Sequence, residues 1–386
     1  MAGAAGENSG AVVNSMGTQT QTPAQIQRER DIAAFLARHG WGDALREKLV
    51  DDASARRYFR LLRHGQSILL MDYPPDAVSI DPHGVSDRPE RAASLAPVVM
   101  TTEMFADCGW RVPGIVAHDM ALGLMLVEDF GDLTFTRALE IGEISTPALY
   151  VQAVDALIDL HRQPEHLWRR PELVTYGPEH FRRQIASFAK DYLPLVIVNQ
   201  AERNRAITGL EDLLAAVLPL CWQAGEVVIH RDYHVDNLML VDTDDGDVAC
   251  GIIDFQDAAI APRPYDLVSL LRDVRHDIGA GLETAMVDRY VAAFPDMDRS
   301  GFDMSYIACG MVRNFRILGR FGWLARETGK RRYLNFVPQA WDLILRGAGE
   351  HLPALQDWVD IHVPPAARQI PDIPDHAPSL SGGGPE

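Results

Sequence analysis

The stretch VIHRDYHVDN, residues 228–237, places two histidines, two aspartates, an arginine and an asparagine within ten residues. Seventeen residues after its final asparagine, the apolar run of IIDFQD, residues 252–257, reaches Asp254. Such a pair of segments is compatible with a metal site, a histidine acid/base pair or the catalytic loop of a phosphotransferase. The surrounding residues are needed to choose among these three interpretations.

The metal interpretation would use His230 and His234, which are spaced four residues apart as two zinc ligands on a helix would be. The preceding Val227, Val228 and Ile229 are β-branched and favour a strand. On a strand or loop this spacing does not bring two imidazoles together, and no third ligand motif is near. The metal interpretation is therefore disfavoured.

The phosphotransfer interpretation explains more of the residues. His-Arg-Asp followed by four residues and Asn, here from His230 to Asn237, has the spacing of a kinase catalytic loop. In that chemistry Asp232 orients the attacking hydroxyl, while Asn237 and Asp254 hold Mg²⁺ against the triphosphate of ATP. If the aspartates were ordinary turn residues, both motifs would have to be accidental. His230 is expected to pack and support the loop, and His234 is equally compatible with a surface role or a substrate contact.

The whole chain sets the limits within which such a site can be built. Its 386 residues suffice for two lobes, and a hydrophobic share of 47% with 23% charged residues is ordinary for a soluble globular protein. The formal net charge of −18 argues against a nucleic-acid-binding surface. No apolar run approaches the length of a membrane span. We therefore expect a monomeric cytoplasmic protein with small-molecule partners.

Composition and periodicity divide the chain into four parts. Residues 1–22 and 365–386 are predicted to be disordered tails. Residues 23–128 are predicted to form a nucleotide-binding lobe, with helices at 24–39 and 93–108, a hairpin with strands at 58–62 and 67–72 and a turn at 64–66, and further strands at 115–117 and 122–127. Residues 128–132, EDFGD, resemble the exit from this lobe. The predicted fold class is therefore α+β.

Residues 129–364 are predicted to form a mostly helical lobe that carries catalysis and substrate binding. Helices are expected at 146–163, 178–192 and 202–223, and again from Tyr265 to about His351. Residues 226–255 are the exception and predict a strand, a loop, a strand, a turn and a strand. The acidic turn at 242–247 lacks the closing glutamate of a calcium loop, so a hairpin turn is the better interpretation.

With IHRDYHVDN and IIDFQDA, the sequence resembles the aminoglycoside phosphotransferase-like kinases, a family with a two-lobed protein-kinase-like fold. Within that family, four further stretches resemble the bacterial anomeric sugar kinases of cell-wall recycling: DDASARRYFRLL (51–62), ILLMDYPP (68–75), LVEDFGD (126–132) and FQDAAIAPRPYDLVSLLRD (255–273). The resemblance covers roughly residues 26–350. It implies ATP- and Mg²⁺-dependent phosphorylation of the C1 hydroxyl of N-acetylmuramate and N-acetylglucosamine.

The resemblance also implies roles for single residues. Asp232 would be the catalytic base or hydroxyl-orienting carboxylate, with Asn237 and Asp254 as the magnesium ligands. The loop at 52–56 would cover the phosphates, the hinge at Glu128 would hold adenine through its backbone, and Asp266 would brace the catalytic loop, a role compatible with capping its helix. Taken together, we expect Ser54, Arg56, Arg57 and Glu128 to contact ATP, His234, Gln256, Asn314 and Arg316 to contact the sugar, and His230 and Asp266 to support the site.

The sequence departs from common kinases at two positions. The strand SILLMD has Met71 near the place of the lysine that pairs with nucleotide phosphates and a helix glutamate. Either the protein is a nucleotide-binding pseudokinase, or an arginine such as Arg56 or Arg57 replaces the lysine. Glu103, on the predicted helix, is as compatible with a surface role as with a functional one. The second departure is Gln256, where protein kinases have glycine, which argues against regulatory flipping of that loop.

Residues 311–332 contain seven basic residues and one acidic residue, a local charge of +6. They form either a solvated helix face or an anion-binding wall suited to the lactyl carboxylate of N-acetylmuramate. Asn314 and Arg316 are the contacts expected in the second case. The competing functions are a kinase of the same fold acting on an aminoglycoside, choline or another amino alcohol, and the pseudokinase.

Overall fold

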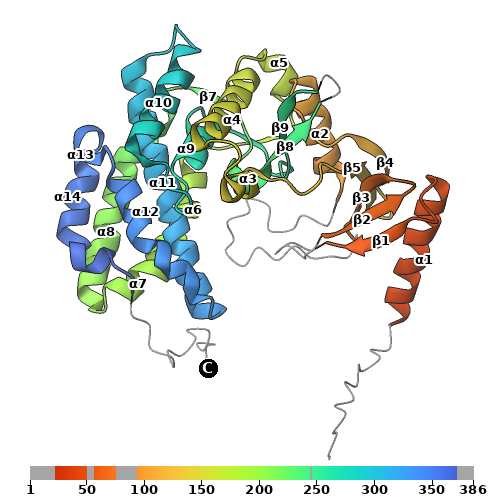
Figure 1. Ribbon diagram of the computed structural model, residues 1–386. Coiled ribbons are helices and arrows are strands. Elements are labelled where there is room, and N and C mark those ends of the chain that lie inside the picture. The colour runs from red at the N-terminus through yellow and green to blue at the C-terminus, as the bar shows by residue number, and fades with distance from the viewer. Residues whose placement is uncertain (1–21, 50–55, 75–93, 244–245, 372–386) are drawn as a thin grey trace, which may run out of the picture.

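A five-stranded antiparallel sheet with the order β1-β2-β3-β5-β4 forms the first part of the molecule. The computed structural model describes residues 22–49, 56–74, 94–243 and 246–371, and it places this sheet at one side with the long helices at the other (Figure 1). The elements of this part are α1 (Pro23–Arg38), β1 (Leu45–Lys48), β2 (Arg57–Arg63), β3 (Gln66–Asp72), α2 (Ala96–Asp107), β4 (Ile115–Asp119) and β5 (Leu124–Glu128).

The predicted hairpin is β2 and β3, and its turn is shorter than expected. Arg63 pairs with Gln66, so that only His64 and Gly65 lie between the strands. Both have positive φ, 50° and 78°, the conformation of a two-residue type I′ turn that matches the twist of the strands. Gln66 therefore belongs to β3 and not to the turn. Strand β1, which pairs with β2, was not predicted.

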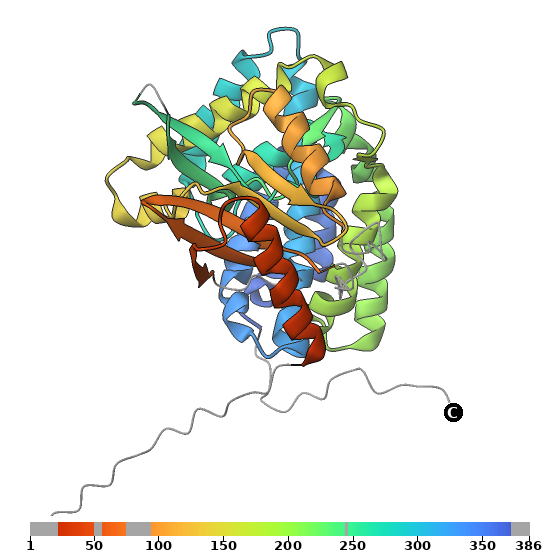
Figure 2. The same ribbon diagram turned by 90° about the vertical axis from the view of Figure 1, so that its right-hand side faces the viewer.

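The two faces of the sheet bury different helices. On one face, Phe59 and Leu61 of β2 pack against Ile32 and Phe35 of α1, and α1 lies across the strands (Figure 2). On the other face Met71 of β3 packs with residues of α2. Because successive side chains of a strand point to opposite faces, residues 56, 58 and 60 share the α2 side and residues 57, 59 and 61 share the α1 side.

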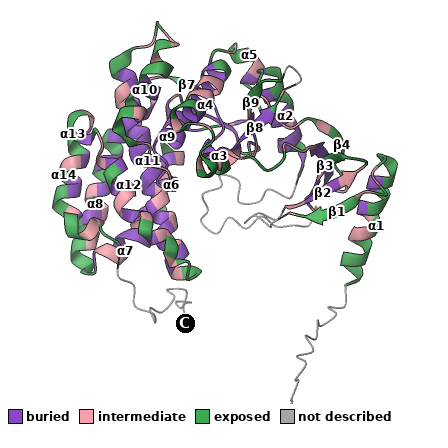
Figure 3. Cartoon of the chain, viewed as in Figure 1, coloured by how far each residue is buried: buried purple, intermediate pink, exposed green. Residues whose placement is uncertain are grey.

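The second part is mostly helical and surrounds the 29-residue helix α11 (Arg299–Glu327). Figure 3 shows the buried residues along α11. Two glycines of α11, Gly319 and Gly322, allow the close approach of a π-helical turn, since a Cβ at either would overlap the backbone of Phe188 or Asp191. The α-helices of this part are α3 (Phe135–Ile141), α4 (Thr146–His161), α5 (Glu165–Trp168), α6 (Pro178–Ser187), α7 (Leu193–Val196), α8 (Gln200–Val217), α9 (Tyr265–Leu271), α10 (Gly279–Ala292), α11, α12 (Val337–Leu345), α13 (Ala348–His351) and α14 (Pro353–His362).

Short strands between the two parts carry the segment with the two motifs. Strand β7 (Glu226–Ile229) precedes the His-Arg-Asp loop, and β8 (Leu238–Asp242) and β9 (Val248–Ile252) form the predicted hairpin that leads to Asp254. Strand β10 (Ala259–Pro262), which was not predicted, pairs with β7 and with the short β6 (Val174–Thr175). The loop that follows β7 is therefore fixed at its base by a three-stranded sheet.

The predicted tails lie largely outside the described residues, which begin at residue 22 and end at residue 371. Residues Pro365–Arg368, which we expected to belong to the C-terminal tail, instead form a 3-10 helix. Arg368 donates from Nε to the Val363 carbonyl at 2.6 Å and pairs with Asp360 at 3.1 Å. Within the described ranges, no helix is long and apolar enough to cross a membrane.

Candidate active site

A cavity of about 410 Å³ lies between the α2 side of the sheet and the loops that follow β7 and β9. Asn237, Asp254 and Gln256 line it from the second part of the molecule, and Arg56 and Glu128 line it from the first. Apolar side chains, among them Leu69, Met71, Val98, Val127 and Met239, form much of its wall. Five residues predicted from two separate motifs, a hinge and the loop at 52–56 thus meet in one cleft.

The His-Arg-Asp loop is held by the buried carboxylate of Asp266. Its Oδ2 accepts the amide N–H of His230 at 2.5 Å and its Oδ1 accepts that of Arg231 at 3.0 Å. Arg231 has φ of 81°, a strained conformation for a residue with a side chain. Asp266 is the second residue of α9, whose N-cap is Pro264, so Asp266 braces the loop and does not cap the helix. Burial raises the pKa of Asp266 to about 7, although both hydrogen bonds oppose this shift.

His230 joins this loop to the loop of Asp254. Its Nε2 lies 2.8 Å from the carbonyl of Ile253, and its Nδ1 lies 3.3 Å from the amide nitrogen of Asp232. Because a backbone amide can only donate, Nδ1 accepts and the ring proton is on Nε2. Burial lowers the pKa of the His230 imidazole, which agrees with a neutral ring. These contacts support the structural role predicted for His230.

Asn237 adds two further links between the same loops. Its side-chain Nδ2 donates to the main-chain carbonyl of Asp232 at 2.9 Å, and its main-chain carbonyl accepts the amide N–H of Ile253 at 3.1 Å. With the side-chain nitrogen engaged in this way, the amide oxygen is the atom of Asn237 suited to a cation.

Asp254, two residues after the end of β9, has an unusual backbone conformation. Its φ is 63°, and with Arg231 and His64 it is one of three non-glycine residues of positive φ in the described chain. Gln256 donates to its Oδ1 at 2.9 Å, and Arg56 Nη1 lies 3.8 Å from the same oxygen. Burial raises the pKa of Asp254 to about 6, and the charges of Asp232 and Asp257 act in the same direction.

This donor set fits a divalent cation such as Mg²⁺. A carboxylate that is repelled by neighbouring carboxylates gains from a nearby cation, and Mg²⁺ commonly uses one or two protein oxygens together with waters and phosphates. Among the described residues no group of three histidine, cysteine or acidic side chains could hold a metal. A fully protein-built metal cage is therefore not present there, and a site shared with a nucleotide is the better match.

Asp232 has a different electrostatic environment from Asp254. Burial acts to raise the pKa of its carboxyl, but the guanidinium groups of Arg316 and Arg231 lower it well below its usual range. Arg316 Nη2 lies 3.3 Å from Asp232 Oδ1. Asp232 therefore stays ionised across the neutral range and can accept a hydrogen bond from a hydroxyl group.

The residues predicted to contact the sugar are placed unequally. Gln256 lines the cavity but is engaged with Asp254. His234 belongs to the loop itself. Its Nδ1 lies 3.6 Å from Oδ2 of Asp236, and burial lowers the pKa of its imidazole to about 4. Asn314 is fully buried and donates to the Gly310 carbonyl at 3.1 Å, so the contact predicted for Asn314 is not available in this arrangement. Arg316 is the predicted residue that reaches the catalytic loop.

The basic stretch at 311–332 does not form one continuous wall. Arg313 is buried and donates to Ser269 Oγ at 2.9 Å, while Arg316 reaches Asp232. Arg320 packs its guanidinium over Trp323, and Arg326 lies 3.6 Å from Asp191 on another side of α11. Each residue advances a helix by about 100°, so side chains spread over the stretch cannot all face one ligand.

Of the residues predicted to contact ATP, only some line the cavity. Ser54 lies outside the described residues. Arg57 forms an ion pair with the buried Asp72 on the α1 side of the sheet, whereas Arg56 lies on the cleft side. The Glu128 carboxylate pairs with Arg111 and accepts the Gly114 amide at 3.1 Å, so it anchors the start of β4. Glu103 is exposed on α2 and does not line this cavity.

Arg60 was missed by the sequence prediction. From the cleft side of β2 it forms paired hydrogen bonds with Asp129 at 2.7 and 3.0 Å and with Asp132 at 2.8 and 2.9 Å. It also donates to the Gly131 carbonyl at 3.2 Å. The strand alternation that places residues 56, 58 and 60 on one face could have identified it. No comparable signal pointed to Asp273, which pairs with Arg275 at 2.6 Å near His234.

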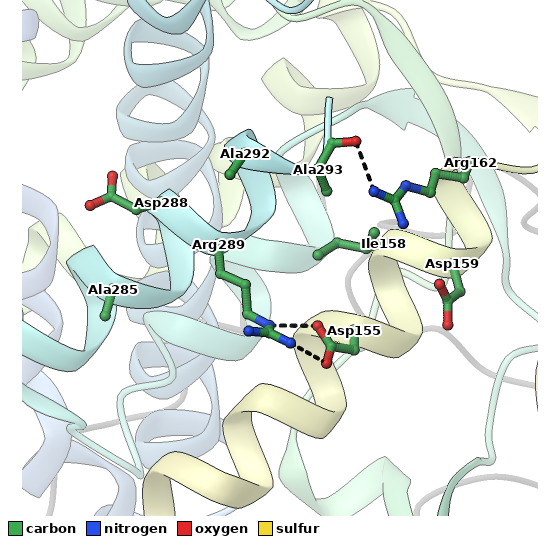
Figure 4. A pocket seen from close by; sticks show the side chains of 9 residues that line it. All are labelled: Asp155, Ile158, Asp159, Arg162, Ala285, Asp288, Arg289, Ala292 and Ala293. Carbon is green, nitrogen blue, oxygen red and sulfur yellow. Dashed lines mark hydrogen bonds and ion pairs between the residues drawn. The ribbon is translucent and has the colours of Figure 1, made fainter. Parts of the chain in front are cut away.

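A second hollow, between α4 and α10, is larger but is lined by none of the residues predicted for the site (Figure 4). Its volume is about 710 Å³. Arg289 forms two 2.6 Å contacts with Asp155 across it, and Arg162 donates to the Ala293 carbonyl at 3.1 Å. Its polar groups largely satisfy one another.

Comparison with known proteins agrees with the geometry of the cleft. A family model described as "Phosphotransferase enzyme family" matches residues 46–301, well over half of the chain. The chain belongs to this phosphotransferase family. A protein of Caulobacter vibrioides named N-acetylmuramate/N-acetylglucosamine kinase is 34% identical over 363 residues, which are 89% of this chain and 99% of the relative.

Solved structures confirm the predicted two-lobed fold of this phosphotransferase. The GDP complex of a mutant aminoglycoside 2′-phosphotransferase matches with a TM-score of 0.57 and 14% identity, covering 84% of this chain and 99% of that one. An ADP-bound aminoglycoside phosphotransferase matches with a TM-score of 0.52 and 11% identity, covering 82% and 96%. The expected resemblance to this family and the α+β fold class are thereby confirmed.

The bracing role of Asp266 predicts a large loss of stability in Asp266→Ala. This change leaves the buried amides of His230 and Arg231 without their acceptor, at a cost of about 1–3 kcal/mol for each amide. Urea unfolding would measure the difference in free energy. Asp242→Ala, at the exposed end of β8, removes a carboxylate without such contacts and serves as the control. Equal stability of the two variants would contradict the bracing role.

Proposed function

We propose that the protein is an ATP-dependent kinase of N-acetylmuramate and N-acetylglucosamine that phosphorylates the anomeric C1 hydroxyl. The observation that carries this proposal is that Asn237 and Asp254 line one cleft while the loop of Asp232 is joined to both of their loops through Asn237, His230 and Ile253. The printed name of the Caulobacter vibrioides relative supports the choice of amino sugars. The reaction would supply a sugar 1-phosphate for peptidoglycan recycling.

The apolar wall of the cavity suits the adenine ring of ATP. Leu69, Met71 and Val127 of the sheet line one part of this wall, and Met239 of β8 lines another. In protein kinases, the chain between the two lobes lies beside this ring, which here corresponds to residues 128–132. Adenine at that end would direct the phosphates toward Asn237 and Asp254. Because ATP is required, we propose that the protein acts in the cytoplasm, as a monomer with small-molecule partners.

We propose that Asn237 and Asp254 hold Mg²⁺ through oxygen atoms. An ion held there would supply positive charge that offsets the negative charge developing during phosphoryl transfer. The chain contributes fixed positions, since Asp254 is held by Gln256 and the Asn237 amide nitrogen is engaged by the Asp232 carbonyl.

Asp232 would orient the C1 hydroxyl of the sugar. Its carboxylate is ionised because Arg316 and Arg231 lower its pKa, and an ionised carboxylate accepts the hydroxyl hydrogen in a strong hydrogen bond. The same low basicity makes early proton removal unfavourable. Positioning and charge stabilisation would therefore supply most of the rate enhancement.

Arg316 is the residue best placed to recognise the lactyl carboxylate of N-acetylmuramate. Its guanidinium is beside Asp232, and its side chain is 19% exposed, whereas Arg313 and Asn314 are buried. His234, two residues after Asp232 in the same loop, is the second contact that we propose. N-acetylglucosamine lacks the lactyl group, so the two sugars would differ in their dependence on Arg316.

Asp232→Asn should lower turnover at least about a hundredfold while ATP still binds. The amide keeps the shape of the side chain but loses the charge that orients the hydroxyl. A coupled ADP-release assay would measure turnover, and calorimetry would measure ATP binding. Asp242→Asn provides the matched control on the exposed end of β8. Near-normal turnover in Asp232→Asn would contradict the proposal that Asp232 orients the hydroxyl group.

The substrate is tested by a panel of N-acetylmuramate, N-acetylglucosamine, kanamycin and choline with Mg²⁺ and ATP. We expect ADP release with the two amino sugars and an acid-labile sugar 1-phosphate detectable by phosphorus NMR. Transfer to kanamycin or choline alone would favour a kinase of another small alcohol. ATP binding without transfer to any member would favour the pseudokinase.

Arg316→Ala should discriminate between the two sugars. Losing a charged hydrogen bond to the lactyl carboxylate should lower kcat/KM for N-acetylmuramate by about a further tenfold or more relative to N-acetylglucosamine. Any effect that acts through Asp232 is common to both sugars and cancels in the ratio. An unchanged ratio would show that Arg316 does not bind the lactyl group.

A further inference from the structure

The cleft side of the sheet lacks the cation that common kinases place on their third strand. Met71, on β3, pairs with Tyr58 of β2 and lies against the apolar residues of α2. It lines the cavity but carries no charge. The phosphates of a bound nucleotide nevertheless require positive charge from the protein or the metal.

Arg57 is directed away from the cleft by the geometry of the strand. It pairs with Asp72 across the β2–β3 ladder, and the two side chains form an ion pair on the α1 side. Arg28 of α1 also contacts Asp72, at 2.6 Å. Asp72 is fully buried, so its two arginines neutralise a charge inside the sheet–helix interface. Arg57 therefore stabilises the packing of α1 on the sheet and does not face the cleft.

Arg60 does face the cavity, but it serves the segment between the lobes. Its guanidinium contacts both Asp129 and Asp132. These two carboxylates, together with the Gly131 carbonyl, occupy the donors of Arg60. Arg60 therefore fixes β2 to the chain that leaves β5.

Arg56 lies at the other end of the cleft side of β2, next to the predicted metal ligand. Its side chain is only 13% exposed, and Nη1 is 3.8 Å from Asp254 Oδ1. That distance is an electrostatic contact and not a hydrogen bond. The guanidinium also lies 5.7 Å from the centre of the Tyr73 ring. Arg56 is therefore a cavity-lining cation beside Asp254, held on the α2 side of the sheet.

We propose that Arg56 binds the nucleotide phosphates and replaces the third-strand lysine from the neighbouring strand. This inference rests on the proposed kinase function and deepens it. Before a nucleotide binds, Asp254 and Arg56 offset each other's charge. With a nucleotide bound, a planar guanidinium can bind two phosphate oxygens at once.

The same arrangement removes the need for a glutamate on α2. In common kinases the third-strand lysine pairs with such a residue. Here Glu103 is exposed and borders a separate hollow with His39 and His118 on the outer side of α2. The carboxylates that act on Arg56 are Asp254 and Asp257, which both come from the other lobe, and Arg56 also has a hydrogen bond with Tyr58 of β2. Arg56 is therefore positioned by contacts with the second lobe and not by a glutamate of α2.

The proposal is tested by calorimetric binding of adenosine and ADP to the full-length protein. Arg56→Ala should weaken ADP binding roughly ten- to a hundredfold, the range for a charged hydrogen bond, and leave adenosine binding unchanged. Arg56→Lys should recover part of the loss, because lysine restores the charge without the fork. Arg63→Ala, at the far end of β2 where Arg63 pairs with Asp43, and Glu103→Gln are the controls and should bind both ligands normally.

The measurements are made with Mg²⁺ and again with EDTA. A loss of ADP binding that persists in EDTA supports direct contact with the phosphates. A loss seen only with Mg²⁺ would mean that Arg56 acts through Asp254, and an equal loss for adenosine and ADP would mean general damage to the cleft. Either result, or an unchanged ADP affinity, overturns the proposal. No sugar is present, so failure of the proposed substrate remains distinguishable.

Discussion

The buried carboxylate of Asp266 is the constraint on which the site depends. It accepts the amides of His230 and Arg231 and so holds the chain at a positive φ before Asp232. His230 then transmits this position to the second loop through the carbonyl of Ile253. Residues that arise from two separate segments are therefore fixed relative to each other by hydrogen bonds of the chain itself, as a preorganised site requires.

The two aspartates of the site are neighbours whose environments separate their pKa values. Burial acts on both, but Asp232 lies beside Arg316 and Arg231, which lower its pKa, while Asp254 has the more distant Arg56 and its pKa is raised to about 6. A carboxylate that is already compensated is suited to accept a hydrogen bond. A carboxylate whose charge is less fully compensated is suited to bind a cation. The difference in charge environment supports the separate roles that we propose for the two aspartates.

Much of the fold and the two catalytic segments could be predicted because their signals are local. A β-branched run followed by the His-Arg-Asp spacing indicates a strand and then a loop, and the hairpin and helices of the first lobe follow from apolar periods. The placement of side chains was harder to predict where their contacts are distant in sequence. Asn314, for which we predicted a sugar contact, is fully buried on α11 and donates to the Gly310 carbonyl.

The sequence by itself determined the chemical groups, their order along the chain and the absence of a lysine on the third strand. Only the tertiary structure decided which groups share the cleft. Arg56 and Arg57 are adjacent and chemically identical, yet strand alternation sends one toward Asp254 and the other toward the buried Asp72. Asp266 gains its role from a loop some 35 residues earlier. Side-chain direction depends on register and packing between distant elements, and neither is encoded in the spacing of a motif.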